Sequence, residues 1–148
     1  MKRHALTVVL ILAIALLSVV GSAQAEKVKL TMWSWNHEPT YYLDLLLIEE
    51  YMKLNPNVEI TRIAIPNQDY ATKLLMGLAT GEGPDIARTK VKDAAYFIEN
   101  GFLAPVDPTA FGAANIEEWE DRYVPGILDG LKHDGNIYGV ICEASAPV

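Results

Sequence analysis

The sequence predicts an α/β domain with a largely parallel sheet covered by helices. Segments with strand patterns alternate with segments rich in helix formers, and the connections between successive strands are too long for hairpins. This alternation is typical of helices packed on a parallel sheet. No internal repeat and no low-complexity linker interrupts the pattern.

Four strands are expected. Residues 58–63 alternate apolar and polar side chains, which is the period of a half-buried strand. Further strands are expected at residues 29–34 and 85–87. The last strand, at residues 137–142, follows a tight turn at residues 134–136, whose sequence is Asp-Gly-Asn.

Two long helices are expected between these strands. Residues 41–54 are rich in Leu and poor in β-branched residues, and the segment is entered at Pro39 and ended before Pro56. The second helix is expected to begin at Asn67 as its N-cap. It is expected to end at Gly81, because glycine adopts the left-handed conformation at low cost.

Two shorter helices are expected further along the chain. Asn115 with Glu118 three residues later resembles a capping box and predicts a helix start. The other helix lies at residues 92–100, with Ala95, Tyr96 and Ile98 as apolar side chains.

Residues 1–25 have the three parts of a cleavable secretory signal. A basic start precedes an uncharged apolar run at residues 5–20, and Ala23 and Ala25 provide the small residues of a cleavage site after Ala25. The alternative is a membrane anchor, but the apolar run is shorter than the roughly 20 residues that a spanning helix needs. We therefore expect a periplasmic or otherwise extracytoplasmic protein.

Charge and cysteine content exclude several classes of protein. The chain carries 19 acidic against 12 basic residues, a net charge of −7, which argues against nucleic acid and anionic membranes as partners. Cys142 is the single cysteine, so an internal disulfide or a cysteine-based metal site is not expected. Within its apolar run, Cys142 is expected to be a small buried side chain.

Candidate binding residues follow three of the predicted strands. Ligands in open α/β sheets collect where the carboxyl ends of strands meet. The candidates are Trp35, His37 and Glu38 after the first strand, Arg88 and Thr89 after the third, and Glu143 after the last. Purely structural roles stay open: Trp35 as a packed aromatic, Glu38 as a complement to a helix dipole, and Arg88 with Lys90 as a solvated strand end.

Enzyme signatures are missing from the sequence. It has no G-x-S-x-G, no P-loop and no H-E-x-x-H, and its histidines lack zinc spacing. We therefore expect no catalysis, no metal and no cofactor. The remaining enzymatic alternative is an exported glycoside hydrolase that uses Glu38 and Glu143 as its carboxylate pair.

Several motifs resemble the family 1 extracellular solute-binding proteins. These proteins are the sugar-binding subunits of ABC importers and include the maltodextrin-binding protein. The most specific stretch is residues 79–86, Ala-Thr-Gly-Glu-Gly-Pro-Asp-Ile, preceded by Tyr70-x-x-Lys73-Leu74. Further similar stretches follow in the family's order, at residues 30–34, 55–58, 100–106 and 134–140.

The resemblance implies a two-lobed, type II periplasmic-binding-protein-like fold that closes on its ligand by hinge motion. Residues 26–141 would be the first segment of the N-terminal lobe, and residues 142–148 the start of the crossover toward a second lobe. Family members are more than twice as long as this chain, which suggests an N-terminal fragment.

The resemblance also implies the function. The protein would be a monomer that binds a sugar or oligosaccharide and delivers it to the membrane permease of an ABC importer. By position, the loop with Trp35, His37 and Glu38 would contact the ligand, as would Arg88, Thr89 and Glu143. Some members carry an aromatic side chain where this chain has Arg88-Thr89-Lys90. A polyamine, a glycerophosphodiester or a peptide therefore stays open as the ligand.

Overall fold

The structure is a computed structural model that describes residues 26–142. The predicted signal at residues 1–25, with its cleavage site at Ala23 and Ala25, lies outside the described residues. So does Glu143, together with most of the predicted crossover at residues 142–148.

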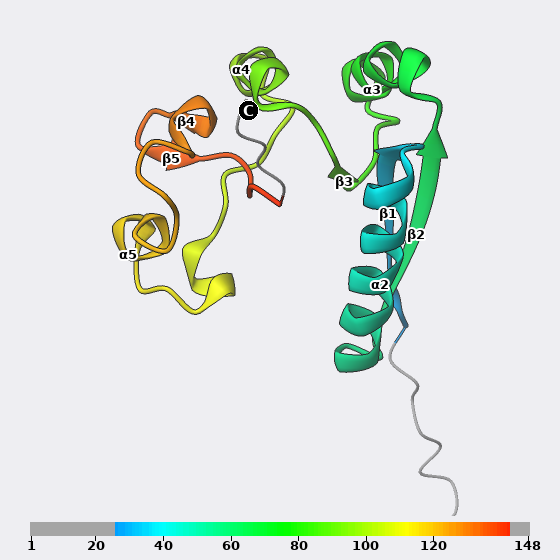
Figure 1. The fold of residues 1–148 in the computed structure, drawn as a ribbon, viewed down its shortest axis with the longest axis horizontal. Helices are drawn as coiled ribbons and strands as arrows, with labels where there is room; N and C mark the ends of the chain where they lie inside the picture. Colours follow the sequence, from blue (N-terminus) through cyan, green and yellow to red (C-terminus); the bar gives the residue numbers. More distant parts are fainter. Residues whose placement is uncertain (1–25, 143–148) are drawn as a thin grey trace, which may run out of the picture.

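A three-stranded parallel sheet forms one side of the molecule, as the sequence predicted (Figure 1). Its central strand is β1 (Val28–Trp35), which pairs in parallel with β2 (Val58–Ile65) along all eight residues. The short strand β3 (Ile86–Ala87) pairs with the other edge of β1, opposite Met32 and Trp33. All three strands therefore end at the same edge of the sheet.

Helices connect the strands and continue beyond them. α2 (Glu38–Leu54) joins β1 to β2, and α3 (Asn67–Thr80) joins β2 to β3. α4 (Val91–Glu99) follows β3. In Figure 1, α2 lies along the strands, and α3 and α4 lie near the edge where the strands end. No helix within residues 26–142 has the length and apolar character needed to cross a membrane.

The helix ends agree with the predictions in part. Gly81 ends α3 in the left-handed conformation, at φ 74°, as predicted. Asn67 is not the N-cap: Pro66 occupies that position, and Asn67 is the first residue of the helix. α4 buries Ala94, Phe97 and Ile98, whereas the predicted Ala95 and Tyr96 are exposed.

Asp85, in the motif before β3, stabilises the sheet. Its carboxylate accepts hydrogen bonds from the backbone N–H of Thr31 at 2.7 Å and from the Thr31 hydroxyl at 2.9 Å. These bonds hold the pKa of Asp85 below its ordinary value. The side chain thus ties the start of β3 to the central strand and places the residues that follow it.

The second half of the chain forms an arm beside the sheet (Figure 1). Its regular elements are η1 (Pro108–Phe111), α5 (Ile116–Glu120), η2 (Asp129–Leu131), β4 (Lys132–His133) and β5 (Asn136–Ile137). Asn115 caps α5 as predicted, since its side chain accepts from the N–H of Glu118 at 2.8 Å. The Glu118 carboxylate reaches back to the N–H of Ala114.

The predicted last strand at residues 137–142 is wrong. Only β5 forms, and it pairs antiparallel with β4 in a separate two-stranded sheet. Asp134 and Gly135 both have positive φ angles, 47° and 75°, which suits a two-residue hairpin turn. The turn directs the chain back onto the residues just before it, so this segment does not join the parallel sheet.

Two apolar clusters hold the sheet and the arm, and α4 contributes to both. One cluster surrounds Trp119 in the arm and includes Ala94 and Ile98 of α4. The other lies under the sheet edge and combines Phe97 of α4 with residues of β2 and α3, with Trp33 and Trp35 packed against it. α4 therefore connects the arm to the edge where the strands end.

Candidate functional site

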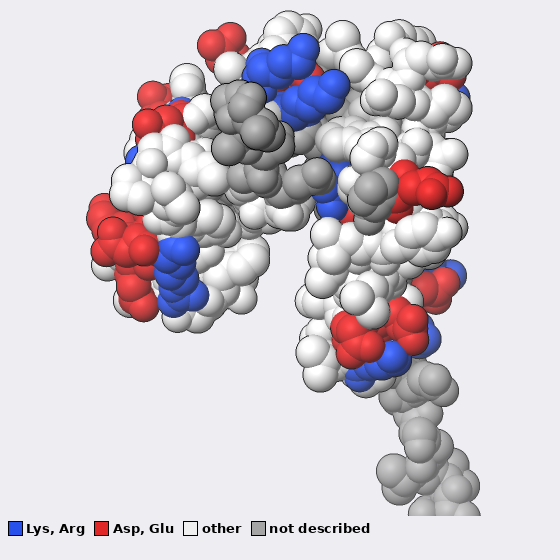
Figure 2. All heavy atoms as spheres, in the orientation of Figure 1, with Lys and Arg blue, Asp and Glu red and all other residues white. Residues whose placement is uncertain are grey.

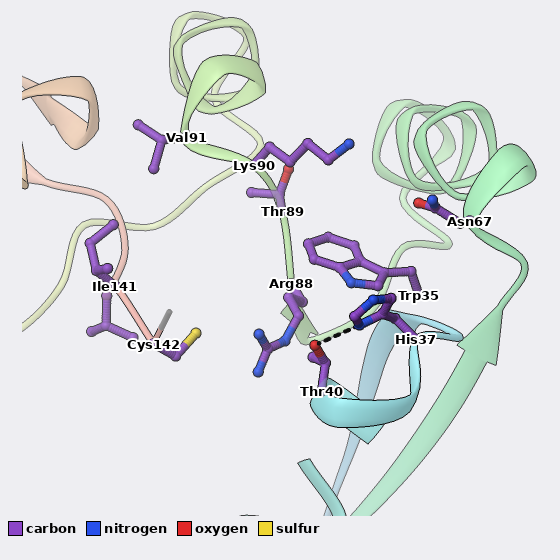
Figure 3. A pocket seen from close by; sticks show the side chains of 11 residues that line it. Trp35, His37, Thr40, Asn67, Arg88, Thr89, Lys90, Val91, Ile141 and Cys142 are labelled. Carbon is purple, nitrogen blue, oxygen red and sulfur yellow. Dashed lines mark hydrogen bonds between the residues drawn. The ribbon is translucent and has the colours of Figure 1, made fainter. Parts of the chain in front are cut away.

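A cavity of about 420 Å³ lies at the edge where the parallel strands end (Figure 3). Its walls come from the end of β1, from the starts of α2, α3 and α4, and from the segment after β5. The lining residues are Trp35, His37, Thr40, Asn67, Arg88, Thr89, Lys90, Val91, Val140, Ile141 and Cys142. The cavity therefore lies at the edge of the sheet where ligand sites are expected in open α/β folds.

The structure brings four of the predicted site residues to this cavity. Trp35, His37, Arg88 and Thr89 all line it. Glu38 is not among the lining residues. It is exposed in the first turn of α2, where its negative charge complements the helix N-terminus. The remaining predicted residue, Glu143, lies outside the described residues.

Trp35 has both a packing role and a lining role. Its ring meets Tyr70 edge to face, with the ring centroids 5.4 Å apart, and it also borders the cavity. The Tyr70 hydroxyl donates to the backbone carbonyl of Trp33 at 2.9 Å, and burial raises the pKa of Tyr70. Tyr70 therefore stays a neutral donor that supports Trp35 from below.

A smaller cavity of about 70 Å³ adjoins the larger one. It reaches down to Tyr70 and Leu74, and the two cavities share lining residues. The shared residues are Trp35, Asn67, Thr89 and Lys90. Figure 3 shows the Trp35 ring between His37 and the Thr89–Lys90 segment, so both cavities open around one aromatic ring.

Arg88 is not a solvated strand end. Its side chain is 7% exposed, and its guanidinium donates to a carboxylate oxygen of Asp44 at 2.8 Å. Its backbone N–H also donates to the carbonyl of Trp33 at 3.0 Å. Arg88 thus borders the cavity while it is tied to the interior, whereas Lys90, the N-cap of α4, is exposed.

The sequence did not predict the buried polar network that lies beneath the cavity. Asp44 of α2 accepts from the Ser34 hydroxyl at 2.7 Å and from the Arg62 Nε at 3.0 Å. The side chains of Asp44 and Arg62 are 1% and 4% exposed. One signal was visible: Asp44 interrupts a run of leucines, four residues before the buried Ile48 on the same helical face.

The network controls the charge of Asp44. Burial by itself would raise the pKa of this carboxyl, but hydrogen bonds from Ser34, Arg62 and Arg88 outweigh burial and hold the pKa below its ordinary value. Asp44 is therefore an anion at neutral pH. The Arg62 guanidinium also stacks over the Tyr41 ring, 4.7 Å from its centroid.

Side chains that can donate hydrogen bonds line the cavity. Arg88, Thr89 and Lys90 are among the lining residues, and the starts of α2, α3 and α4 also contribute to the walls. None of these three helices has a side-chain N-cap bond. Cys142 lines the cavity and is exposed, so the prediction of a buried thiol is wrong. Across residues 26–142, no group of three or more metal-ligating side chains is assembled.

The fold and the position of the cavity define a class. The sheet is the start of a type II periplasmic-binding-protein-like lobe, and the cavity lies at the edge where its strands end. The chain belongs to the bacterial extracellular solute-binding protein family, whose model matches residues 34–144.

Individual relatives agree with this assignment. A putative binding protein of Brucella abortus (strain 2308) is 23% identical over 137 residues, which are 93% of this chain and 32% of the relative. The family 1 solute-binding protein of Alicyclobacillus acidocaldarius has a TM-score of 0.64 at 25% identity and matches 78% of this chain. An ABC substrate-binding protein of Listeria monocytogenes, solved with cycloalternan, has a TM-score of 0.62 at 26% identity and matches 77% of this chain.

The chain spans about a third of the curated relatives that it matches. It spans 28% of each of these two solved structures.

Proposed function

We propose that this protein is the extracytoplasmic substrate-binding component of an ABC importer, and that the cavity is one wall of a sugar-binding cleft. The observation that carries the proposal is the Trp35 ring beside donors from Arg88, Thr89 and Lys90 at the edge where the strands end. Aromatic rings pack against the apolar faces of sugars, and donors bind sugar hydroxyls. The cycloalternan complex of the Listeria monocytogenes relative supports a saccharide.

The proposed protein acts by binding and not by catalysis. It leaves the cytoplasm through the signal at residues 1–25, works as a monomer, and presents its liganded shape to the permease. Glu143 adds a carboxylate acceptor to the same cleft. On the face drawn in Figure 2, acidic groups lie around α5 and along α2. Basic side chains lie near α4, beside the acidic group of α5 and at the lower end of α2, so the described residues form no continuous basic patch on this face of the kind that suits nucleic acid.

Residues 26–141 are proposed to be the first segment of the N-terminal lobe, with residues 142–148 leading toward a second lobe. Exposed apolar surface among the described residues supports this division. A groove of about 540 Å³ lies between α2 and β3 on one side and residues 138–142 on the other, and several leucines of α2 are exposed. Such large apolar surfaces are uncommon on a complete lobe.

One observation favours a second class of ligand. The charged side chains among the described lining residues, Arg88 and Lys90, are both basic. They favour an anionic solute such as a glycerophosphodiester over a polyamine, because like charges repel in a partly buried site. A phosphorylated or acidic ligand is therefore the main alternative to a neutral sugar.

Titration calorimetry on the full-length protein tests the proposal. The panel holds maltotriose and xylotriose as saccharides, glycerophosphocholine, spermidine and trialanine. We expect heat of binding with a trisaccharide and no release of shorter sugars on long incubation. Binding of glycerophosphocholine alone would transfer the assignment to the anionic alternative, and steady release of monosaccharide would refute a pure binding function.

A further inference from the structure

Four segments of the chain meet at the side chain of Asp44. Ser34 comes from β1, Arg62 from β2 and Arg88 from the residue after β3, and all three donate to its two carboxylate oxygens. The distances are 2.7, 3.0 and 2.8 Å. One carboxylate on α2 thus joins β1, β2 and the residue that follows β3, near the edge where the cavity lies.

The partners of Asp44 in turn hold the backbone of the cavity wall. Arg62 donates from Nη2 to the carbonyl of Trp35 at 3.2 Å and to the Ser34 hydroxyl at 2.9 Å. That carbonyl also accepts from the N–H of His37. The segment with Trp35 and His37 is therefore fastened through Arg62, and the segment with Thr89 and Lys90 is fastened through Arg88.

Asp44 is the shared ion-pair partner of two buried arginines, Arg62 and Arg88. The carboxylate lies between two guanidinium groups whose side chains are 4% and 7% exposed. Hydrogen bonds to a charged group inside a protein are stronger than neutral ones, and removing one partner of a buried ion pair leaves the other charge poorly compensated. Without the carboxylate, Arg62 and Arg88 would repel each other, and each would lose an anchor next to the cavity.

We propose that Asp44 is a positioning residue for the ligand-binding wall: it does not touch ligand, but through Arg62 and Arg88 it sets the positions of Trp35 and of Thr89. Asp44 is absent from the residues that line the 420 Å³ cavity. It borders the adjoining groove of about 540 Å³, but its side chain is only 1% exposed, which agrees with an indirect role. The ligand part of this proposal rests on the proposed function, while the structural part stands without it.

Hydrogen exchange of the full-length protein, read by mass spectrometry, tests the structural part. In Asp44→Asn we expect amide protection to fall by about tenfold or more at residues 35–40 and 86–91, because charge-assisted bonds are lost there. Residues 58–61 at the other end of the sheet and residues 132–137 in the arm are expected to lose markedly less protection than these two segments. Equal loss of protection everywhere would overturn the proposal, since it would indicate a general role in stability.

Two further variants complete the test. Glu49→Gln removes another carboxylate from α2, one that pairs with Lys53 on the surface, and is expected to change nothing at either segment. Ser34→Ala keeps every charge but removes a hydroxyl that donates to Asp44 and accepts from Arg62. It should loosen residues 35–40 even if Asp44→Asn fails to fold; unchanged exchange in Ser34→Ala would count against the network.

Affinity for maltotriose and xylotriose tests the functional part. We expect Asp44→Asn to bind the trisaccharide that the wild type binds about tenfold more weakly or worse, and Glu49→Gln to bind it normally. Increased exchange with unchanged affinity would refute the positioning of a ligand wall. If the wild type binds neither sugar, the proposed function fails, and the exchange data still decide the role of Asp44.

Discussion

Asp44 and Arg88 are 44 residues apart in the chain, yet the carboxylate of one accepts a 2.8 Å hydrogen bond from the guanidinium of the other inside the protein. The bond joins the first long helix to the residue that follows the edge strand. It lies directly beneath the candidate site, since Arg88 borders the cavity. The stability of the sheet edge and the geometry of the site therefore depend on the same side chains.

Replacing Asp44 with Asn is expected to lower the free energy of unfolding by about 3–5 kcal/mol, because it removes the shared partner of two buried guanidiniums. Urea unfolding followed by circular dichroism measures the change. Glu49→Gln on the same helix is the control, and we expect it to leave the midpoint nearly unchanged because its ion pair is exposed. Equal midpoints for Asp44→Asn and the wild type would contradict the network.

Acid should weaken the wild type more than Asp44→Asn. A carboxyl whose pKa is lower in the folded than in the unfolded state contributes stability that is present above its unfolded pKa and is lost as pH falls through its folded pKa. The pKa of Asp44 lies below the ordinary value of 3.8. Unfolding free energies measured from about pH 5 downward should therefore converge for the two proteins in strong acid. A constant difference in unfolding free energy between the two proteins across that pH range would show that ionisation of Asp44 does not cause the loss of stability in acid.

Gly77 marks a close approach between α3 and the sheet. A Cβ atom there would lie 3.0 Å from the Trp33 ring and 3.1 Å from the backbone Cα of Gly83. We expect Gly77→Ala to destabilise the protein by about 1–3 kcal/mol, because the energetic cost of overpacking exceeds the stabilisation from the higher helix propensity of alanine. The control is Gly139→Ala, where the nearest atom is at 3.6 Å. A thermal midpoint that rises in Gly77→Ala would contradict the packing.

Asn115 is expected to stabilise the arm through its cap on α5. Asn115→Ala removes the acceptor for the N–H of Glu118 and should cost about 1 kcal/mol. Thermal unfolding read in the near ultraviolet follows the nearby Trp119. Glu117→Gln in the same turn is a matched control that keeps the cap. A similar shift of the thermal midpoint in both variants would argue against a capping role for Asn115.

Trp35 is expected to supply the aromatic surface of the site. Trp35→Ala should weaken binding of the trisaccharide by about tenfold, and Trp35→Phe should retain most of the affinity because a ring remains. Calorimetric titration compares the two, and circular dichroism checks that both variants are folded. Wild-type affinity in Trp35→Ala would place the ligand elsewhere.

Local signals in the sequence predicted most of the elements correctly. The alternation at residues 58–63, the leucine-rich helix and the glycine at position 81 each correspond to an observed element, because each depends on neighbours in the chain. Four of the residues that were expected at the ends of strands also lie together in one cavity: Trp35, His37, Arg88 and Thr89. The motif at residues 79–86 pointed to the family that the comparison then showed.

Other features depended on contacts that a local pattern does not record. The segment after residue 137 has the composition of a strand, but its pairing was decided by the hairpin turn and by the availability of β4.

The sequence by itself determined the alternation of strands and helices, the family and the edge at which the candidate site lies. Only the tertiary structure decided that Asp44, Arg62 and Arg88 share one buried cluster beneath that site. These residues are separated by 18 and 44 positions, and each looks like an ordinary charged residue in its own segment. Burial gives their interaction its strength, and burial arises only when the helix and the three strands pack together.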